Sequence, residues 1–443
     1  MIIRLSDHFS YGRLMRFVMP TVGMMLVTSI YSIVDGFFVS NVVGKNAFAA
    51  VNLVMPYLMA VSAIGFMIGT GGNALVSKIL GEGNRDRANR IFSMLIVSVA
   101  VAGIILTAVS YIFMPQIVHL LGGTPEISGP AVLYGRVVSL SGTFFMMQNC
   151  FESFLVTAEK PKMGLAVSAA AGLMNALLDY TLMVPFKLGI LGAAIATLLS
   201  QTTGALIPLV YFARKNSSLL RLTKTSLNWH ELGQVCLNGS SELLSNLSAS
   251  IVGMLYNFEL MRIAGVDGIA AYGVIMYLNF IFMTFFFGYA IGVAPLVGYN
   301  YGAKNNAELG NLYKKSLAVT AAAALAMTLL SVGFALPLSR IFVGYDEKLC
   351  ALTVHGMRLY SLSFLICGFN IFGSAFFTAL GNGGLSALIS ILRTLVLQVA
   401  AILILPLFFG ADGIWTALVA AEALTLCVTV FLLQKNKRRY GYA

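Results

Sequence analysis

Apolar runs long enough to cross a lipid bilayer recur along the whole chain. A membrane-spanning helix needs about 20 consecutive apolar residues, and twelve segments have this character. They cover residues 14–40, 47–77, 90–114, 131–157, 163–185, 189–212, 235–261, 268–298, 316–338, 353–379, 384–406 and 411–434. Only 10% of the residues are charged, against about 25% in a soluble domain. We therefore predict an all-α polytopic membrane protein with twelve transmembrane helices.

The basic residues predict how these helices are oriented. They gather in alternate loops, for example at Arg85, Arg87 and Arg90, and again in the C-terminal stretch 435–443. Basic loops stay in the cytoplasm, so we expect both termini there. The net charge of +11 is thus a topology signal and predicts no nucleic-acid partner. We expect the first span to act as the insertion signal, since no usual cleavage site precedes it.

The two halves of the sequence are similar to each other. Several landmarks coincide when the chain is shifted by 221 residues: 43–50 falls on 264–271, 81–84 on 302–305, 151–158 on 372–379, and Pro185 on Pro406. A shift by six helices keeps their orientation, so the halves are parallel repeats. We predict two six-helix lobes, residues 1–212 and 235–434, joined by a cytoplasmic linker at 213–234 and followed by a basic tail at 435–443.

Acidic residues inside the apolar runs indicate function, because a charge at membrane depth is costly. Six occur in such runs: Asp35, Glu152, Asp179, Glu242, Glu259 and Glu422. Asn175 precedes Asp179 by four residues, which places both on one helix face. Tyr31 precedes Asp35 by the same spacing. The 221-residue shift puts Asp35 on Tyr256 and Asp179 on Ala400, so this polar cluster belongs to the first half alone.

Helix geometry places four of these polar residues at one depth. Asp179 lies about 9 Å before Pro185, Thr197 about 12 Å after Gly189, and Asp35 about 8 Å from the outer end of its span. Asp35, Asn175, Asp179 and Thr197 form an all-oxygen set that suits a hard cation such as Na⁺. Two close carboxylates also resist ionising together, so the pair could exchange protons for a cation. The alternative is a hydrogen-bonded polar cluster that only fixes helix packing.

The remaining intramembrane polar residues have weaker assignments. Glu152, three residues after Asn149, would attract a cationic substrate or pair with a neighbouring basic residue. Glu242 is a second candidate carboxylate for substrate, whereas Glu259 and Glu422 receive no role. Pro20 removes one backbone hydrogen bond from the first span and predicts either a fixed bend or a hinge.

Enzyme chemistry is not supported by the sequence. The histidines at 8, 119, 230 and 355 stand in unrelated regions, and no zinc-protease or nucleophilic-serine motif has its partners. The five cysteines are scattered, which predicts neither a disulfide framework nor a metal cluster. We therefore predict no catalytic cofactor.

Taken together, these residues resemble the multidrug and toxic compound extrusion (MATE) family over nearly the whole chain. The resemblance rests on Pro20, on Tyr31-Ser-Ile-Val-Asp35, on Asn149, on Asn175-Ala-Leu-Leu-Asp179 and on Thr197, within two sixfold repeats. In the prokaryotic branch, Asp35, Asn175, Asp179 and Thr197 would match cation-binding positions, Tyr31 and Asn149 pocket positions, and Pro20 the bending point. Other branches bind the cation near an acidic residue early in the seventh helix, where Glu242 stands, and that alternative remains open.

The resemblance implies secondary active efflux of organic cations by antiport with Na⁺ or H⁺, through alternating access between two lobes. It implies a monomer in a bacterial or archaeal plasma membrane, with cationic amphiphilic molecules as substrates and the lipid bilayer as its other partner. A flippase or exporter of lipid-linked oligosaccharides from the same superfamily is the alternative. Its cavity should be more basic, whereas the apolar runs here hold more acidic than basic residues.

Overall fold

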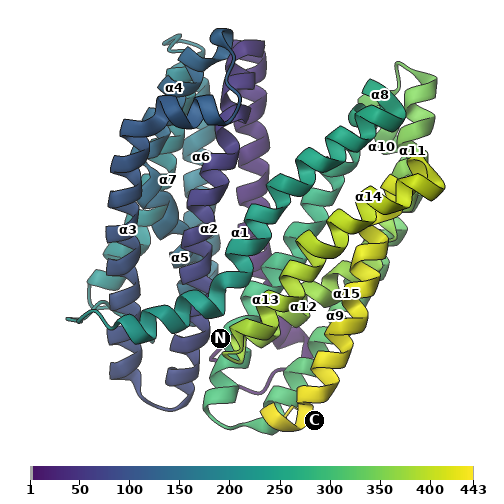
Figure 1. Cartoon of the computed structure of the whole chain (residues 1–443). Helices are drawn as coiled ribbons and strands as arrows, with labels where there is room; N and C mark the ends of the chain where they lie inside the picture. The colour runs from purple at the N-terminus through teal and green to yellow at the C-terminus, as the bar shows by residue number, and fades with distance from the viewer. Residues whose placement is uncertain (1–2, 443) are drawn as a thin grey trace.

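Two helical bundles stand against each other in a V. The structure is a computed structural model that describes residues 3–442, the side chains of Ser32 and Lys45 excepted. The bundles meet at the end that carries both chain termini and diverge at the other end (Figure 1). Helices account for nearly all of the described chain, which confirms the predicted all-α fold.

The first bundle is formed by α1 (Tyr11–Phe38), η1 (Val39–Val43), α2 (Lys45–Gly81), α3 (Arg85–Leu120), α4 (Pro125–Leu140), α5 (Gly142–Thr157), α6 (Pro161–Met183) and α7 (Ile190–Ala213). The second is formed by α8 (Trp229–Gly302), α9 (Asn306–Gly333), α10 (Ala335–Val343), α11 (Glu347–Ser361), α12 (Phe364–Ala379), α13 (Gly383–Ile391), η2 (Leu392–Val396), α14 (Leu397–Phe409) and α15 (Ala411–Tyr440). The segments η1 and η2 are short π-helices. Helix α8 starts beneath the first bundle and runs into the second (Figure 1).

The helices are compatible with twelve membrane spans. Within residues 3–442, nine helices are long and apolar enough to cross a bilayer, or ten when α11 and α12 count as one bent span. The 74-residue α8 contains two of the predicted spans, separated where Gly265 leaves the helical conformation. Helices α4 and α5 together cover the predicted span 131–157.

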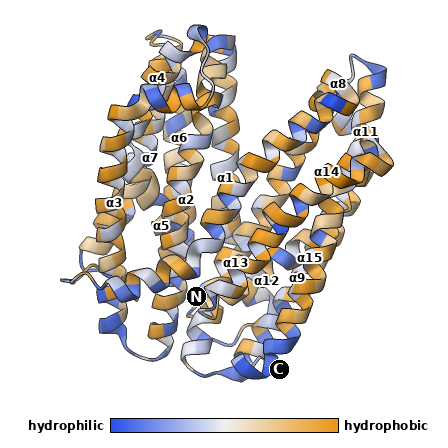
Figure 2. Ribbon diagram, in the orientation of Figure 1, coloured by the Kyte–Doolittle hydropathy of each residue, from blue (hydrophilic) through white to orange (hydrophobic). Residues whose placement is uncertain are grey.

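The apolar surface of the helices faces outward, as lipid contact requires. Along α3, Ile104 is 61% exposed and Ile112 is 63% exposed. Hydropathy mapped on the ribbon is mostly apolar along the helices and hydrophilic at the end that holds the termini (Figure 2). In water such exposed aliphatic side chains would be unfavourable, whereas in a bilayer they are solvated by lipid tails.

The backbone repeats the symmetry of the sequence. Asn84 caps α3 and Asn305 caps α9, each accepting from the backbone N–H three residues later. Gly189 (φ 57°, ψ −137°) and Gly410 (φ 56°, ψ −131°) precede α7 and α15 with nearly the same positive-φ geometry, which glycine adopts readily. These pairs obey the 221-residue shift, which confirms the parallel internal repeat.

Glycines allow the two bundles to touch backbone to backbone where they meet. A Cβ atom on Gly81 of α2 would overlap the carbonyl oxygen of Tyr299 in α8, and one on Gly302 of α8 would overlap that of Lys78 in α2. These two contacts are equivalent under the repeat. Farther along α2, Gly71 makes a similar approach to α8. The converging end is therefore held by close helix packing that only small residues permit.

The segment before α1 also joins the bundles at this end. The backbone N–H of Leu5 donates to Glu159 Oε1 of the α5–α6 turn at 2.6 Å. The backbone N–H of Phe9 donates to Glu308 Oε1 of α9 at 2.9 Å. Leu5 and Phe9 are both fully buried. A short N-terminal segment thus bridges the two bundles with hydrogen bonds and apolar contacts.

Substitution of Gly302 tests the close packing. We expect Gly302→Ala to destabilise the protein by about 1–3 kcal/mol, the usual cost of overpacking, because its methyl group would collide with backbone. Gly333→Ala is the matched control, since Gly333 has no neighbour within 4 Å of an added Cβ. Thermal unfolding in detergent measures both. Equal melting temperatures for the two variants would contradict the proposed role of the contact.

Candidate functional site

Three of the four predicted cation-binding residues come together between α1 and α6. These helices pack side by side, with Asp35 on α1 and both Asn175 and Asp179 on α6. All three side chains are buried, Asp179 completely. The carboxyl groups of Asp35 and Asp179 are close enough for the charge of one to act on the other. The i, i+4 spacing read from the sequence therefore places Asn175 and Asp179 on the face that meets Asp35.

The oxygens of this cluster lack donors. Among the described residues, no hydrogen-bond partner reaches either carboxyl oxygen of Asp179, Oδ1 of Asp35 or Oδ1 of Asn175. Two ionised carboxylates only accept hydrogen bonds. Two ionised carboxylates in a buried site repel each other, and a proton or a cation between them would relieve that repulsion. An amide oxygen beside two carboxylates is a ligand set that fits a hard cation.

Thr197 reaches the cluster through a tyrosine that the sequence analysis missed. Tyr134 of α4 is fully buried, is a neighbour of Thr197 of α7, and is close enough for the charges of Asp35 and Asp179 to act on its hydroxyl group. Tyr134 has no polar neighbour at helical spacing that would mark it in the sequence. The structure thus adds a phenol hydroxyl to the predicted set and places Thr197 at its margin.

The predicted pocket residues of the first bundle lie near this cluster. Tyr31 is electrostatically close to both Asp35 and Glu152. Glu152 of α5 is buried, and Gln148 and Ser168 are its polar neighbours. Its neighbours are therefore an amide and a hydroxyl, and its Oε1 has no partner among the described residues.

Two further predicted residues have simpler surroundings. Asn149 donates from Nδ2 to the carbonyl oxygen of Ser62 at 3.5 Å, which links α5 to α2. Pro20 lies within α1, which continues as a helix through it.

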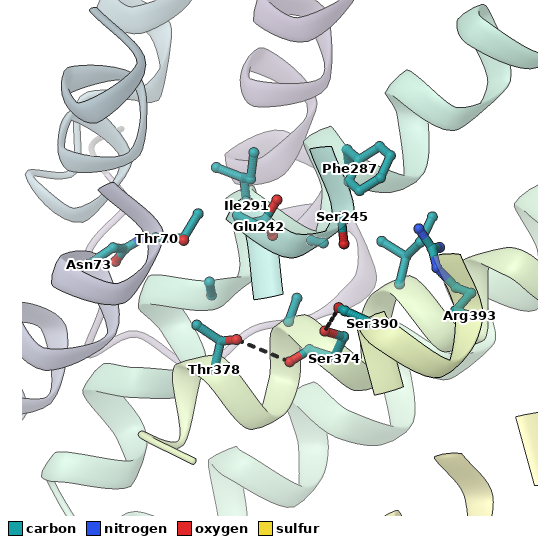
Figure 3. A pocket seen from close by; sticks show the side chains of 14 residues that line it. Thr70, Asn73, Glu242, Ser245, Phe287, Ile291, Ser374, Thr378, Ser390 and Arg393 are labelled. Atoms are coloured by element: carbon teal, nitrogen blue, oxygen red, sulfur yellow. Dashed lines mark hydrogen bonds between the residues drawn. The ribbon is translucent and has the colours of Figure 1, made fainter. Parts of the chain in front are cut away.

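Glu242 stands apart from the cluster, in a pocket between the two bundles. The residues that line this pocket are Thr70, Asn73, Glu242, Ser245, Phe287, Ala290, Ile291, Ala294, Ile371, Ser374, Ala375, Thr378, Ser390 and Arg393. Figure 3 shows Thr70 and Asn73 of α2 on one side and Arg393 of η2 on the opposite side. Glu242 is electrostatically close to Arg393. The structure therefore does not join Glu242 to the carboxyl pair of the first bundle.

The two unassigned acids are neutralised locally. Glu259 pairs with Arg262 one helical turn away, at 2.7 Å between Oε2 and Nη2. Glu422 Oε1 lies 3.7 Å from Arg393 Nη1, and its Oε2 accepts from Asn370 Nδ2 at 2.7 Å. Asn370 is the repeat equivalent of Asn149. Arg393, which the sequence analysis did not single out, therefore lies between the acids Glu422 and Glu242 of the second bundle.

Comparison with known proteins identifies the family. The MatE family model matches residues 20–181 and again residues 243–404, once in each repeat. The chain belongs to the MatE family. The resemblance to multidrug and toxic compound extrusion transporters is thereby confirmed, and the protein is a multi-pass membrane protein rather than an enzyme.

Relatives and solved structures agree with this assignment over nearly the full length. The chain is 24% identical to "Multidrug export protein MepA" of Staphylococcus saprophyticus, covering 95% of this chain and 93% of the relative. It is 25% identical to the protein of that name from Staphylococcus aureus, covering 96% and 94%. A solved "outward-facing conformation of a multidrug resistance MATE family transporter" superimposes with a TM-score of 0.92 at 21% identity, covering 99% and 98%.

The buried carboxyl pair allows a test for a cation that binds between its two groups. A ligand that binds only the folded state adds about 2.7 kcal/mol at 100 times its Kd. We expect Na⁺, but not K⁺, to raise the melting temperature of the detergent-solubilised protein and to lose this effect in Asp179→Asn. Asp86→Asn, at an exposed position, is the control and should respond like the native chain. An equal response to Na⁺ and K⁺ would exclude a selective Na⁺ site and leave the proton as occupant.

Proposed function

We propose that the protein is a secondary active transporter that exports organic cations across the plasma membrane in exchange for Na⁺ or H⁺. The observation that carries the proposal is that Asp35 and Asp179 are buried neighbours, and that three of their four carboxyl oxygens have no hydrogen-bond partner among the described residues. The names of the curated relatives, which are multidrug export proteins, support export as the direction and drugs as the cargo.

In this proposal the coupling ion occupies Asp35, Asn175, Asp179 and Thr197, with Tyr134 beside them. Binding of Na⁺ or of a proton relieves the repulsion between the two carboxyl groups and so changes the packing of α1 on α6. Thermodynamic linkage then requires that ion and substrate weaken each other's binding if they favour different states. Tyr31, Asn149, Glu152 and Glu242 are proposed to contact the substrate on its path.

Helix α1 is suited to transmit this change to the boundary between the bundles. Val18 and Val22 flank Pro20, and both pack on α8. A Cβ atom on Gly288 would come within 2.7 Å of Val22 Cα, and one on Gly292 within 2.7 Å of Val18 Cγ1. A bend at Pro20 would break this packing, so we assign Pro20 the role of a hinge between the cation site and the bundle contact.

The V shape is the basis on which we assign the structure to one state of the proposed transport cycle. With the basic, terminus-bearing end in the cytoplasm, as the positive-inside rule predicts, the bundles close toward the cytoplasm and diverge toward the outside (Figure 1). This corresponds to an outward-open state with residues 1–212 and 235–434 as the two moving lobes, the linker 213–234 between them and the tail 435–443 inside. The inward-open state would require separation of the glycine contacts between α2 and α8.

Neutral variants of the two carboxyl groups test the coupling site. We expect Asp35→Asn and Asp179→Asn each to reduce ion-driven efflux of a fluorescent cation from proteoliposomes about tenfold or more, within the usual range of coupling. Asp86→Asn should transport normally. Ion-driven efflux at the native rate in both site variants would contradict the proposed coupling role.

A Na⁺ gradient and a pH gradient, applied one at a time, identify the coupling ion. Proteoliposomes that hold the protein would receive either a Na⁺ gradient at uniform pH or a pH gradient without Na⁺. We expect one of the two to drive efflux of the cation and the other to have little effect, because one cluster provides the coupling site. Efflux that proceeds equally without any ion gradient would contradict antiport.

A further inference from the structure

A cleft with three basic side chains lies at the terminus-bearing end of the first bundle, distinct from the pocket between the bundles. Arg16 belongs to α1, whereas Lys160 and Lys162 belong to the start of α6. The cleft has a volume of about 350 Å³. Its other lining residues are Ile3, Phe17, Glu159, Pro161 and Met163.

The basic groups of this cleft are largely available to a ligand. Arg16 and Lys162 are exposed, and neither forms a hydrogen bond or an ion pair with any residue that the structure describes. Lys160 donates a hydrogen bond of 3.4 Å to Ser217 Oγ. The acid of the cleft, Glu159, accepts the backbone N–H of Leu5. Three basic groups therefore accompany one carboxylate, and the cleft carries a surplus of positive charge.

The internal repeat separates this charge from the requirements of the fold. The 221-residue shift puts Arg16 on Leu237, Lys160 on Gly381 and Lys162 on Gly383. These three equivalents line a corresponding cleft in the other half of the molecule. The lysine of that second cleft, Lys78, comes from α2 and has no counterpart in the first. The fold thus forms this cleft twice and needs a basic residue at none of the three positions.

The topology signal does not account for the charges either. The turn 381–384 is equivalent to the turn that carries Lys160 and lies at the same end of the molecule, yet it holds no charged residue. Orientation by basic loops therefore tolerates an uncharged turn at this place. The three basic residues of the first cleft need another explanation, and binding of an anion provides one.

An exposed apolar stripe leads from the cleft along α6. Lys162 is followed on the same helix face by Ala166, Ala170, Leu173 and Leu177, all of them exposed. The exposed fractions of Leu173 and Leu177 are 66% and 65%. A basic group at the end of an apolar stripe matches the head group and the acyl chain of a lipid. A soluble anion would use the basic groups alone.

We propose that this cleft binds an anionic phospholipid, with the phosphate group among Arg16, Lys160 and Lys162 and an acyl chain along the stripe of α6. Basic pockets at the cytoplasmic side of membrane helices suit anionic head groups, and arginine can hold two phosphate oxygens in parallel. With this end in the cytoplasm, as proposed above, the lipid belongs to the inner leaflet. Because Arg16 precedes Pro20 by one helical turn, the lipid would hold this end of α1 against α6.

Native mass spectrometry of the purified protein counts the lipids that stay bound once detergent is removed. Dioleoyl phosphatidylglycerol, which is anionic, is titrated alongside dioleoyl phosphatidylcholine, which is zwitterionic and has the same acyl chains. The native protein is compared with Arg16→Gln/Lys162→Gln. The matched control is Lys314→Gln/Arg438→Gln, which removes two exposed basic residues of the second bundle. Glycerol phosphate, which lacks acyl chains, serves as a soluble competitor.

We expect the native protein to bind phosphatidylglycerol more tightly than phosphatidylcholine. Arg16→Gln/Lys162→Gln should weaken binding of phosphatidylglycerol at least about tenfold, since each basic residue near a membrane surface contributes to the attraction of anionic lipid. Its binding of phosphatidylcholine should stay within about twofold of the native value. The charge-preserving variant Arg16→Lys/Lys162→Arg should bind phosphatidylglycerol within about threefold of the native protein.

Three results would overturn the proposal. Equal binding of the two lipids by the native protein would exclude recognition of the anionic head group. An equal loss in Lys314→Gln/Arg438→Gln would show a general effect of surface charge rather than a site. Displacement of phosphatidylglycerol by glycerol phosphate at the same concentration would leave a site for soluble phosphate compounds and no role for the stripe. The measurement involves no transport, so its outcome is independent of the proposed export function.

Discussion

The close contact of α2 with α8 is the packing on which the arrangement of the two bundles depends. Without a hydrophobic driving force between helices in lipid, association relies on close van der Waals packing, and glycine permits the closest approach. Gly81 and Gly302 make symmetric contacts with backbone carbonyls of the other bundle. Because this packing occurs at one end only, the bundles are free to diverge at the other, and the V shape follows.

The polar interior departs from the symmetry that the backbone keeps. Both halves use equivalent asparagine caps and positive-φ glycines, yet only the first buries the carboxyl pair of Asp35 and Asp179. The second half instead buries Arg393 between two acids. A repeat explains the fold, whereas the departures from it mark where the two bundles differ chemically. This division leaves the proposed ion site in one bundle and Glu242 in the pocket between the two bundles.

Much of the candidate site was predictable because helix periodicity is local. Asn175 and Asp179 share a helix face because they are four residues apart. Pro185 and Gly189 marked the helix ends from which the depths of the polar residues were counted. Tyr134 was not predictable, because nothing in its own segment distinguishes it from an interior or interfacial side chain. Arg393 is a charge inside the apolar run 384–406 and carries the same signal as the buried acids, which the sequence analysis did not use. Their neighbours come from other helices, and the meeting of Tyr134 with Thr197 depends on how α4 packs against α7. For the same reason the sequence left two roles open for Glu152, attraction of a cationic substrate or pairing with a basic residue. In the structure its polar neighbours are Gln148 and Ser168.

The sequence by itself determined the membrane-spanning helical class, the parallel repeat and the residues whose burial is costly. These depend on the length of apolar runs, on a constant shift and on side-chain chemistry, all of which are properties of the chain alone. Only the tertiary structure decided that Asp35 meets Asp179, that Glu242 faces Arg393 instead, and that the bundles close at one end. Those results depend on which helix faces come into contact, and in lipid that choice is made by side-chain shape at the crossing points rather than by hydrophobicity along the chain.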